Sequence, residues 1–93
     1  MKTQFQVLFI RDVKCADADK MQGDVKEVCK KGGIHVATVF SNTPMGKGLM
    51  AKYGVTATPT LVKIRWQEVL GEMLTGRSGR NEITRWVKRA IPR

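Results

Sequence analysis

The sequence predicts an α/β domain in which helices cover both faces of one mixed, four-stranded sheet. Three observations lead to this fold class. A nearly continuous apolar run near the start is typical of a strand buried on both faces. Apolar residues at helical spacing follow it and recur near the end of the chain. Helical and strand-like segments alternate in the order β-α-β-α-β-β-α, and 93 residues suffice for one such domain, residues 1–93.

The first half of the chain predicts a strand–helix–strand unit. Residues 4–10, QFQVLFI, form the expected first strand, and residues 34–40, IHVATVF, form the second. Between them a helix is expected over residues 16–31, ended by two glycines. The apolar stripe of this helix consists of Met21, Val25, Val28 and Cys29. Two strands joined through a helix should be parallel, with a right-handed crossover.

The second half predicts a helix, a hairpin and a final helix. A short helix is expected over residues 44–52, because a threonine cap and a proline precede its first turn. Residues 60–66 and 69–75 are the expected third and fourth strands, antiparallel and joined by a turn at Gln67-Glu68. The last helix is expected over residues 80–91. Its apolar face consists of Ile83, Trp86, Val87 and Ala90.

This order of elements, with a proline ahead of the third strand, resembles the thioredoxin fold. The segment KYGVTATPTLV, residues 52–62, carries the local resemblance: a Tyr-Gly-aliphatic helix end, small residues, a proline and a strand. In the thioredoxin-like superfamily that proline is cis and its loop faces the active-site cysteine. The resemblance implies a cis Thr58–Pro59 bond, which an X-Pro pair allows at small cost. A trans-proline turn before an edge strand is the alternative.

The C-x-x-C motif of that superfamily is incomplete here. The junction VKCADADKM places Cys15 where the nucleophilic cysteine would be, and Ala18 stands at the position of the second. The chain's other cysteine is Cys29. On one helix the two would lie about 21 Å apart, at a rise of 1.5 Å per residue. A disulfide needs Cα atoms within about 7 Å, so we expect Cys29 to be a buried core residue.

Two functions remain open. The first is a protein-binding or adaptor module without dithiol oxidoreductase activity, acting through a groove beside the cis-Pro loop. There a partner peptide, or the backbone of glutathione, would pair with Thr58 like an added strand. The second is a monothiol, glutaredoxin-like protein in which Cys15 forms a mixed disulfide with glutathione or a client protein. The candidate binding residues are Lys14, Ala57, Thr58, Pro59 and Trp66.

Separate arguments support Cys15 and Trp66 as functional residues. A helix N-terminus favours negative charge, so Cys15 is the candidate thiolate. The positive charge of Lys14 should favour the thiolate form, and the first-turn Asp17 and Asp19 should oppose it. Trp66 ends the third strand, and tryptophan is enriched in contact hot spots. The stretch ATPTLVK also resembles the same region of KaiB, a circadian-clock adaptor with a thioredoxin-like fold.

The formal charge of +9 indicates an acidic partner. Ten Lys and Arg against three Glu follow from residue 44 on. The expected anion-binding residues are Arg77, Arg80, Arg85, Lys88 and Arg89. Nucleic acid is an alternative partner, and a solvated basic surface without a specific ligand is another. No resident metal or cofactor is expected, apart from glutathione as a possible ligand. The sequence has no membrane-length apolar run and no leader cleavage signal, so we expect a cytoplasmic protein.

Overall fold

The computed structural model describes residues 5–89 and confirms the expected element order up to the hairpin. The expected ends of the first strand and the last helix, at residue 4 and residues 90–91, lie outside the described residues. The elements are β1 (Gln6–Arg11), α1 (Ala16–Lys31), β2 (Val36–Phe40), α2 (Pro44–Tyr53), β3 (Thr60–Arg65), β4 (Glu68–Val69), β5 (Leu74–Thr75) and α3 (Arg80–Lys88). No helix among these is long and apolar enough to cross a membrane.

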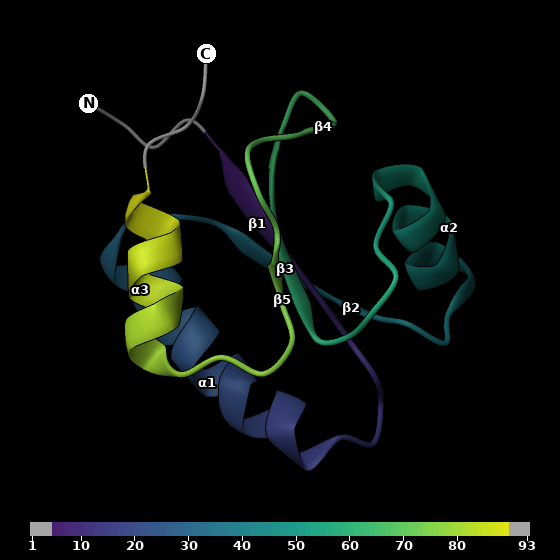
Figure 1. Cartoon of the computed structure of the whole chain (residues 1–93), viewed down its shortest axis with the longest axis horizontal. Coiled ribbons are helices and arrows are strands. Elements are labelled where there is room, and N and C mark those ends of the chain that lie inside the picture. Colours follow the sequence, from purple (N-terminus) through teal and green to yellow (C-terminus); the bar gives the residue numbers. More distant parts are fainter. Residues whose placement is uncertain (1–4, 90–93) are drawn as a thin grey trace.

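The sheet is mixed, with strand order β2-β1-β3-β4 and β5 also paired to β3 (Figure 1). β1 and β2 are parallel, as predicted, whereas β1 and β3 are antiparallel. In the β1–β3 ladder Ile10 lies opposite Thr60 and Gln6 lies opposite Ile64. The ends of β1 and β2 and the start of β3 therefore share one edge of the sheet. The end of β3 lies at the opposite edge.

The expected fourth strand is two short strands, so the sheet has five strands and not four. Gly71, between β4 and β5, has a φ of +64°, which breaks the extended conformation. The turn before β4 is also one residue earlier than predicted. Trp66 and Gln67 occupy it with φ of 55° and 64°, the left-handed geometry of a two-residue type I′ hairpin. Neither is the glycine or asparagine that usually marks such a turn.

α1 and α3 cover one face of the sheet, and α2 covers the other (Figure 1). Val7 and Phe9 of β1 point into the core shared with α1 and α3. Leu8 and Ile10 point to the other face, where α2 packs. This alternation explains why β1 is apolar at successive positions. The α1–α3 core is completed by Ala18, Met21, Val25, Cys29, Ile34, Leu61, Ile83 and Trp86.

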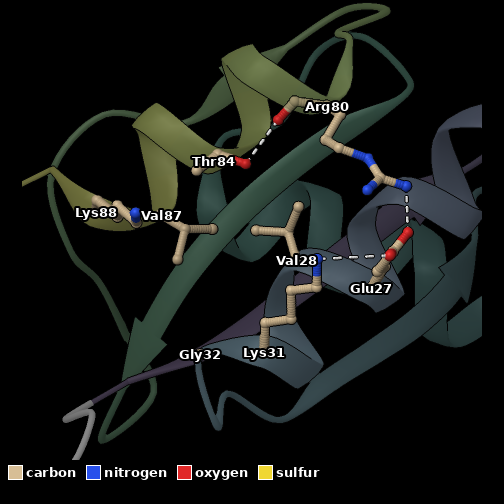
Figure 2. A pocket seen from close by; sticks show the side chains of 8 residues that line it. All are labelled: Glu27, Val28, Lys31, Gly32, Arg80, Thr84, Val87 and Lys88. Atoms are coloured by element: carbon tan, nitrogen blue, oxygen red, sulfur yellow. Dashed lines mark hydrogen bonds and ion pairs between the residues drawn. The ribbon is translucent and has the colours of Figure 1, made fainter.

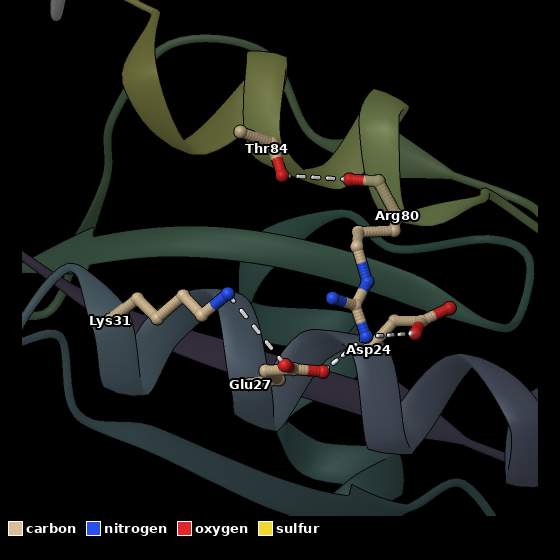
Figure 3. A network of polar contacts seen from close by, with 5 residues as sticks. All are labelled: Asp24, Glu27, Lys31, Arg80 and Thr84. Carbon is tan, nitrogen blue, oxygen red and sulfur yellow. Dashed lines mark hydrogen bonds and ion pairs between the residues drawn. The ribbon is translucent and has the colours of Figure 1, made fainter.

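An ion-pair network fastens α3 to α1 on the outer side of the helical layer (Figure 3). The guanidinium of Arg80 lies 3.5 Å from the Asp24 carboxylate and also contacts Glu27. Lys31 lies 3.7 Å from the second carboxylate oxygen of Glu27. Exposed pairs of this kind contribute about 0–1 kcal/mol each, so the network adds little to the stability of the fold.

Lys63 is a cation buried under the end of α3, with 4% of its surface exposed. Its Nζ lies 4.8 Å from the centroid of the Trp86 ring and 5.2 Å from that of Phe5. The same nitrogen donates a hydrogen bond of 3.4 Å to the Arg89 carbonyl oxygen. Burial lowers the pKa of Lys63 from its ordinary value of 10.5, and the charge of Arg89 lowers it further.

Lys63→Met is expected to raise the free energy of unfolding at pH 7 by about 1 kcal/mol, because methionine fills a similar space without desolvating a charge. The folded pKa of Lys63 lies below 10.5, so the unfolded chain holds this proton at higher pH than the folded chain. Wild-type stability therefore gains as pH rises through the folded pKa towards 10.5. The difference in the free energy of unfolding between Lys63→Met and wild type should therefore shrink as the pH rises. Urea unfolding at pH 7 and pH 10 measures both effects. A variant less stable than wild type at pH 7 would show that the ring contacts outweigh burial.

Candidate functional site

Three loops meet at the edge of the sheet where β1 and β2 end. They are the loop after β1, the loop before β3 and the loop after β5. The Gly76 N–H donates a hydrogen bond of 2.7 Å to the Pro59 carbonyl oxygen. The Arg77 guanidinium lies 3.3 Å from the Asp17 carboxylate in the first turn of α1. These contacts bring the start of α1 and the proline loop to the same edge.

The loop before β3 contains the predicted proline site. The Thr58–Pro59 peptide bond is cis. Pro59 is buried, Thr58 is half-buried and Ala57 is exposed. Thr58 precedes the first paired residue of β3, Thr60, so it lies outside the ladder. The Thr60 hydroxyl donates a hydrogen bond of 2.6 Å to the Ala57 carbonyl oxygen and fixes the bend.

Asp12 ties the proline loop to the ends of the two parallel strands. Its carboxylate accepts a hydrogen bond from the Ser41 hydroxyl, and the Thr58 side chain lies near enough to influence its pKa. The Ser41 hydrogen bond, followed by the Thr58 side chain, holds the pKa of Asp12 below its ordinary range, with a smaller contribution from the charge of Arg11. Sequence reasoning missed this residue. Asp12 follows β1 and Ser41 follows the parallel β2, and the carboxyl ends of parallel strands share an edge.

Arg11 holds the loop that leads to Cys15. Its side chain is 4% exposed and lies under that loop. The guanidinium donates to the carbonyl oxygens of Asp12 (3.0 Å) and Val13 (3.1 Å) and to Gln22 Oε1 (2.7 Å), and pairs with the Asp19 carboxylate (2.6 Å). The planar, five-donor guanidinium suits such a multiply bonded position. Arg11 therefore positions the β1–α1 loop, a role that the sequence did not indicate.

Cys15 is the residue that caps α1, and Lys14 before it is exposed. The Cys15 backbone is extended, and its carbonyl oxygen accepts a hydrogen bond of 3.0 Å from the Asp19 N–H. The side chain is half-buried and packs against the α1–α3 core. The candidate thiol therefore lies at the start of α1, at the edge that also holds the proline loop.

Three large apolar side chains are exposed at this edge: Val13 (46%), Phe40 (38%) and Met45 (68%). We call them the edge patch. Arg11 joins the first two, because it binds the Val13 carbonyl and its guanidinium lies 5.5 Å from the centroid of the Phe40 ring. Met45 is in the first turn of α2, whose capping residue Thr43 donates to the Phe40 carbonyl oxygen at 2.8 Å. These contacts place the backbones of the three residues at one edge, beside the loop that holds Asp12.

Comparison with known proteins identifies the architecture. No protein-family model and no curated protein matches the chain. Solved structures do match. The reduced thioredoxin pre-protein of Schistosoma mansoni has a TM-score of 0.77 and 21% identity, over 94% of this chain and 79% of that one. Fasciola hepatica thioredoxin has a TM-score of 0.75 and 21% identity, over 92% and 80%. A thioredoxin-like protein from Clostridium perfringens has a TM-score of 0.73 and 16% identity, over 94% and 71%. The chain has the thioredoxin fold.

Within this thioredoxin fold, Trp66 does not join the other predicted binding residues. It is 88% exposed and lies in the turn after β3, whereas Pro59 lies just before β3. The 6 residues of β3 lie between them and span about 20 Å at about 3.3 Å each. A partner that contacts both stays a prediction, and the two residues lie about one strand length apart. The polarity of the strand explains why, because residues that flank one strand lie at opposite edges of the sheet.

The predicted basic group is partly neutralised in this thioredoxin fold. Arg77 and Arg80 pair with carboxylates of α1, and the Arg89 guanidinium lies 3.4 Å from the Glu72 carboxylate. Arg85 and Lys88 are exposed on α3 and form no ion pair within residues 5–89. The same residues contain no cluster of three or more His, Cys, Asp or Glu suited to a metal ion.

The two thiols differ in chemistry. Both are free, and Cys29 is fully buried in the α1–α3 core of the thioredoxin fold. Burial raises the pKa of Cys29 from 9.0 to about 11, because the thiolate is poorly solvated there. This agrees with its expected place in the core. About 21 Å of helix separates the two cysteines, so Cys29 does not supply the missing partner thiol.

In the folded protein at pH 8, iodoacetamide is expected to modify Cys15 and leave Cys29 unmodified. Cys29 is buried, and its raised pKa keeps it as the neutral thiol. Mass spectrometry of a time course should show one fast addition, and a second only when urea unfolds the chain. The fast addition should persist in Cys29→Ser and disappear in Cys15→Ser. Rapid double modification of the folded wild type would contradict this assignment.

Proposed function

We propose that this thioredoxin-fold chain is a protein-binding module that contacts its partner through the edge patch and the cis-Pro loop. One observation carries the proposal. Three of the four large apolar side chains exposed within residues 5–89 lie at the edge that holds this loop. Clustered exposed apolar side chains next to polar residues are typical of protein interaction sites. Lys14 borders the same edge, so the proposed partner combines apolar and acidic groups.

The backbone of the proline loop supports the same proposal. Thr58 lies outside the β3 ladder, next to the bend at Pro59. An extended segment of a partner can pair with such a backbone in the manner of an added strand. Apolar side chains of that segment would then lie against Val13 and Phe40. In this arrangement Asp12 has a positioning role, because its bond to Ser41 joins the ends of β1 and β2 beside the proline loop.

The distribution of thiols argues against dithiol exchange as the activity. Release of a client from a mixed disulfide needs a second thiol that can reach the first. Ala18 occupies the position three residues after Cys15 and is buried. Cys29 is buried about one helix length away, beyond the 7 Å or so that a disulfide tolerates. Binding without exchange is the function that this arrangement supports best.

The proposal is tested by partner capture under reducing conditions with matched variants. Proteins retained by immobilised wild type in dithiothreitol are identified by mass spectrometry, and each is then measured against the variants. Val13→Asp with Met45→Asp should reduce retention at least tenfold, because both side chains are exposed in the edge patch. Trp66→Asp, an equally exposed change at the opposite edge, should not. Cys15→Ser should also retain the partner.

Two outcomes would overturn the proposal. Retention that survives the edge-patch variant but is lost in Trp66→Asp would move the interface to the opposite edge of the sheet. Capture that needs both Cys15 and the absence of reductant would show covalent chemistry in place of binding. Thermal unfolding followed by circular dichroism checks that each variant remains folded.

A monothiol reaction of Cys15 is the second candidate, favoured by one specific observation. Unpaired carboxylates in the first turn of α1 would oppose a thiolate at Cys15. Both carboxylates are instead paired with arginines, Asp17 with Arg77 and Asp19 with Arg11, which offsets their negative charge. In the reaction, the Cys15 thiolate attacks one sulfur of oxidised glutathione. The old S–S bond breaks, a mixed disulfide forms, and one glutathione leaves as a thiolate.

Oxidised glutathione tests this second candidate directly. One glutathione adduct per chain should form, with release of one equivalent of reduced glutathione. The adduct should be present in Cys29→Ser and absent in Cys15→Ser. A rate of adduct formation no greater than that of a short peptide containing the VKCAD sequence would remove the monothiol reading and leave the binding proposal untouched.

A further inference from the structure

A pocket of about 340 Å³ lies between α1 and α3, on the outer side of the helical layer (Figure 2). It is distinct from the edge that holds the proline loop. Lys31, which lines the pocket, ends α1, and Cys15 lies before its start. The 16 residues of α1 span about 24 Å. The volume is at the lower end of the range for small-molecule sites, about 300–1,000 Å³.

The pocket has apolar walls that the protein itself leaves incompletely packed. Val28 of α1 and Val87 of α3 face one another across it (Figure 2). Both are only half-buried, although the α1–α3 core lies directly beneath them. A ligand with an apolar body would remove these side chains from water, which is favourable by about 25 cal/mol per Å² of apolar surface. A fully hydrated inorganic ion would not use these walls.

The ionisable residues of the pocket give it an excess of positive charge. Three cations, Lys31, Arg80 and Lys88, line it together with one carboxylate, Glu27. Arg80 is engaged by Glu27 and Asp24. Lys31 reaches Glu27 only at 3.7 Å, and Lys88 forms no ion pair within the described residues. Glu27 is therefore shared by Arg80 and Lys31, so one carboxylate does not balance both cations, and Lys88 adds a further positive charge.

We propose that this pocket binds a small organic carboxylate, with its apolar body between Val28 and Val87 and its charge at Lys31 and Lys88. The Arg80–Glu27 ion pair lies at one end of the pocket (Figure 2). Charge-assisted hydrogen bonds from lysine ammonium groups give the carboxylate its preference over a neutral ligand of the same shape. This site and the proposed protein-binding edge share no residue, so each can fail without the other.

The test uses 2-naphthoate and 2-naphthamide, which have the same ring system and differ in charge. Each is titrated into ¹⁵N-labelled full-length protein, and amide shifts are followed in two-dimensional NMR spectra. We expect 2-naphthoate to shift the amides of Val28, Lys31, Thr84 and Val87, with saturation. The amide analogue should bind about tenfold more weakly, which corresponds to about 1.4 kcal/mol. Lys31→Gln with Lys88→Gln should weaken 2-naphthoate binding by a similar factor.

A matched control variant distinguishes binding in the pocket from the general attraction of an anion to a protein with a formal charge of +9. Lys26→Gln with Lys30→Gln also removes two positive charges, from exposed positions of α1 that do not line the pocket. This variant should bind 2-naphthoate within twofold of wild type. Three outcomes would overturn the proposal: no saturable shift at millimolar probe, shifts centred on other residues, or equal losses in the two lysine variants. Equal binding of the two probes would equally refute the carboxylate preference.

Discussion

Gly46→Ala is expected to lower the free energy of unfolding by about 3 kcal/mol, the upper range for overpacking a buried position. A Cβ atom at Gly46 would lie 1.9 Å from the Phe40 carbonyl oxygen and 2.8 Å from its carbon. These are backbone atoms at the end of β2, so no side-chain rotation relieves the clash. The N–H of Gly46 is also bonded to the capping Thr43 hydroxyl at 3.0 Å. The first turn of α2 must therefore shift or lose its cap.

Gly48→Ala is the matched control, because it makes the same change two residues later in the same helix. A Cβ atom at Gly48 would meet nothing within 4 Å. Alanine is favoured over glycine inside a helix by about 1 kcal/mol, so this variant should be more stable than wild type. Urea unfolding followed by circular dichroism gives both values. A Gly46→Ala variant at least as stable as wild type would show that α2 does not approach Phe40 as closely as the structure has it.

The fold was predictable because each main element has a pattern of its own. The run from Val7 to Ile10 is apolar at each position, and the structure buries its residues alternately on the two faces. The bounds of α1 match the expected range, since two first-turn aspartates, two last-turn lysines and a glycine pair mark its ends. Such signals are local, so sequence alone contains them.

The hairpin was less predictable because its turn uses unusual residues. Trp66 and Gln67 both adopt positive φ, for which sequence rules expect asparagine or glycine. The pattern alone therefore placed the turn one residue late. The single strand expected over residues 69–75 is divided at Gly71, and both pieces pair with β3. Glycine inside a strand pattern is a signal for such a break, and it could have been used.

The positions of the candidate residues were predictable from the family resemblance, whereas the contacts that hold their loops were not. Cys15 and Pro59 were both identified from matched positions in the sequence, and the structure brings their loops to one edge. The contacts that fix those loops join side chains far apart in the sequence. Arg11 and Asp12 carry most of them, and their partners depend on tertiary packing. Only the shared edge of two parallel strands hinted at Asp12 and Ser41.

Arg11→Met is expected to lower the free energy of unfolding by about 2 kcal/mol and to loosen the loop before Cys15. Hydrogen bonds to a charged group contribute about 1.5–3 kcal/mol each, but the loop carbonyls can regain water once the guanidinium is gone. The loss should therefore be far smaller than the sum of four contacts. Hydrogen exchange of the Val13 and Lys14 amides should accelerate about tenfold, because Arg11 holds the carbonyls of Asp12 and Val13.

Two further variants decide whether the geometry or the charge of Arg11 is responsible. Arg11→Lys keeps the charge but lacks the planar fork, so it should recover only part of the lost stability and leave exchange of the loop amides fast. Arg65→Met removes an exposed arginine from the end of the neighbouring strand and should change stability by no more than about 0.5 kcal/mol. Full recovery by lysine would assign the role to charge alone. An Arg11→Met variant as stable as Arg65→Met, with slow loop exchange, would mean that the β1–α1 loop holds its shape without Arg11.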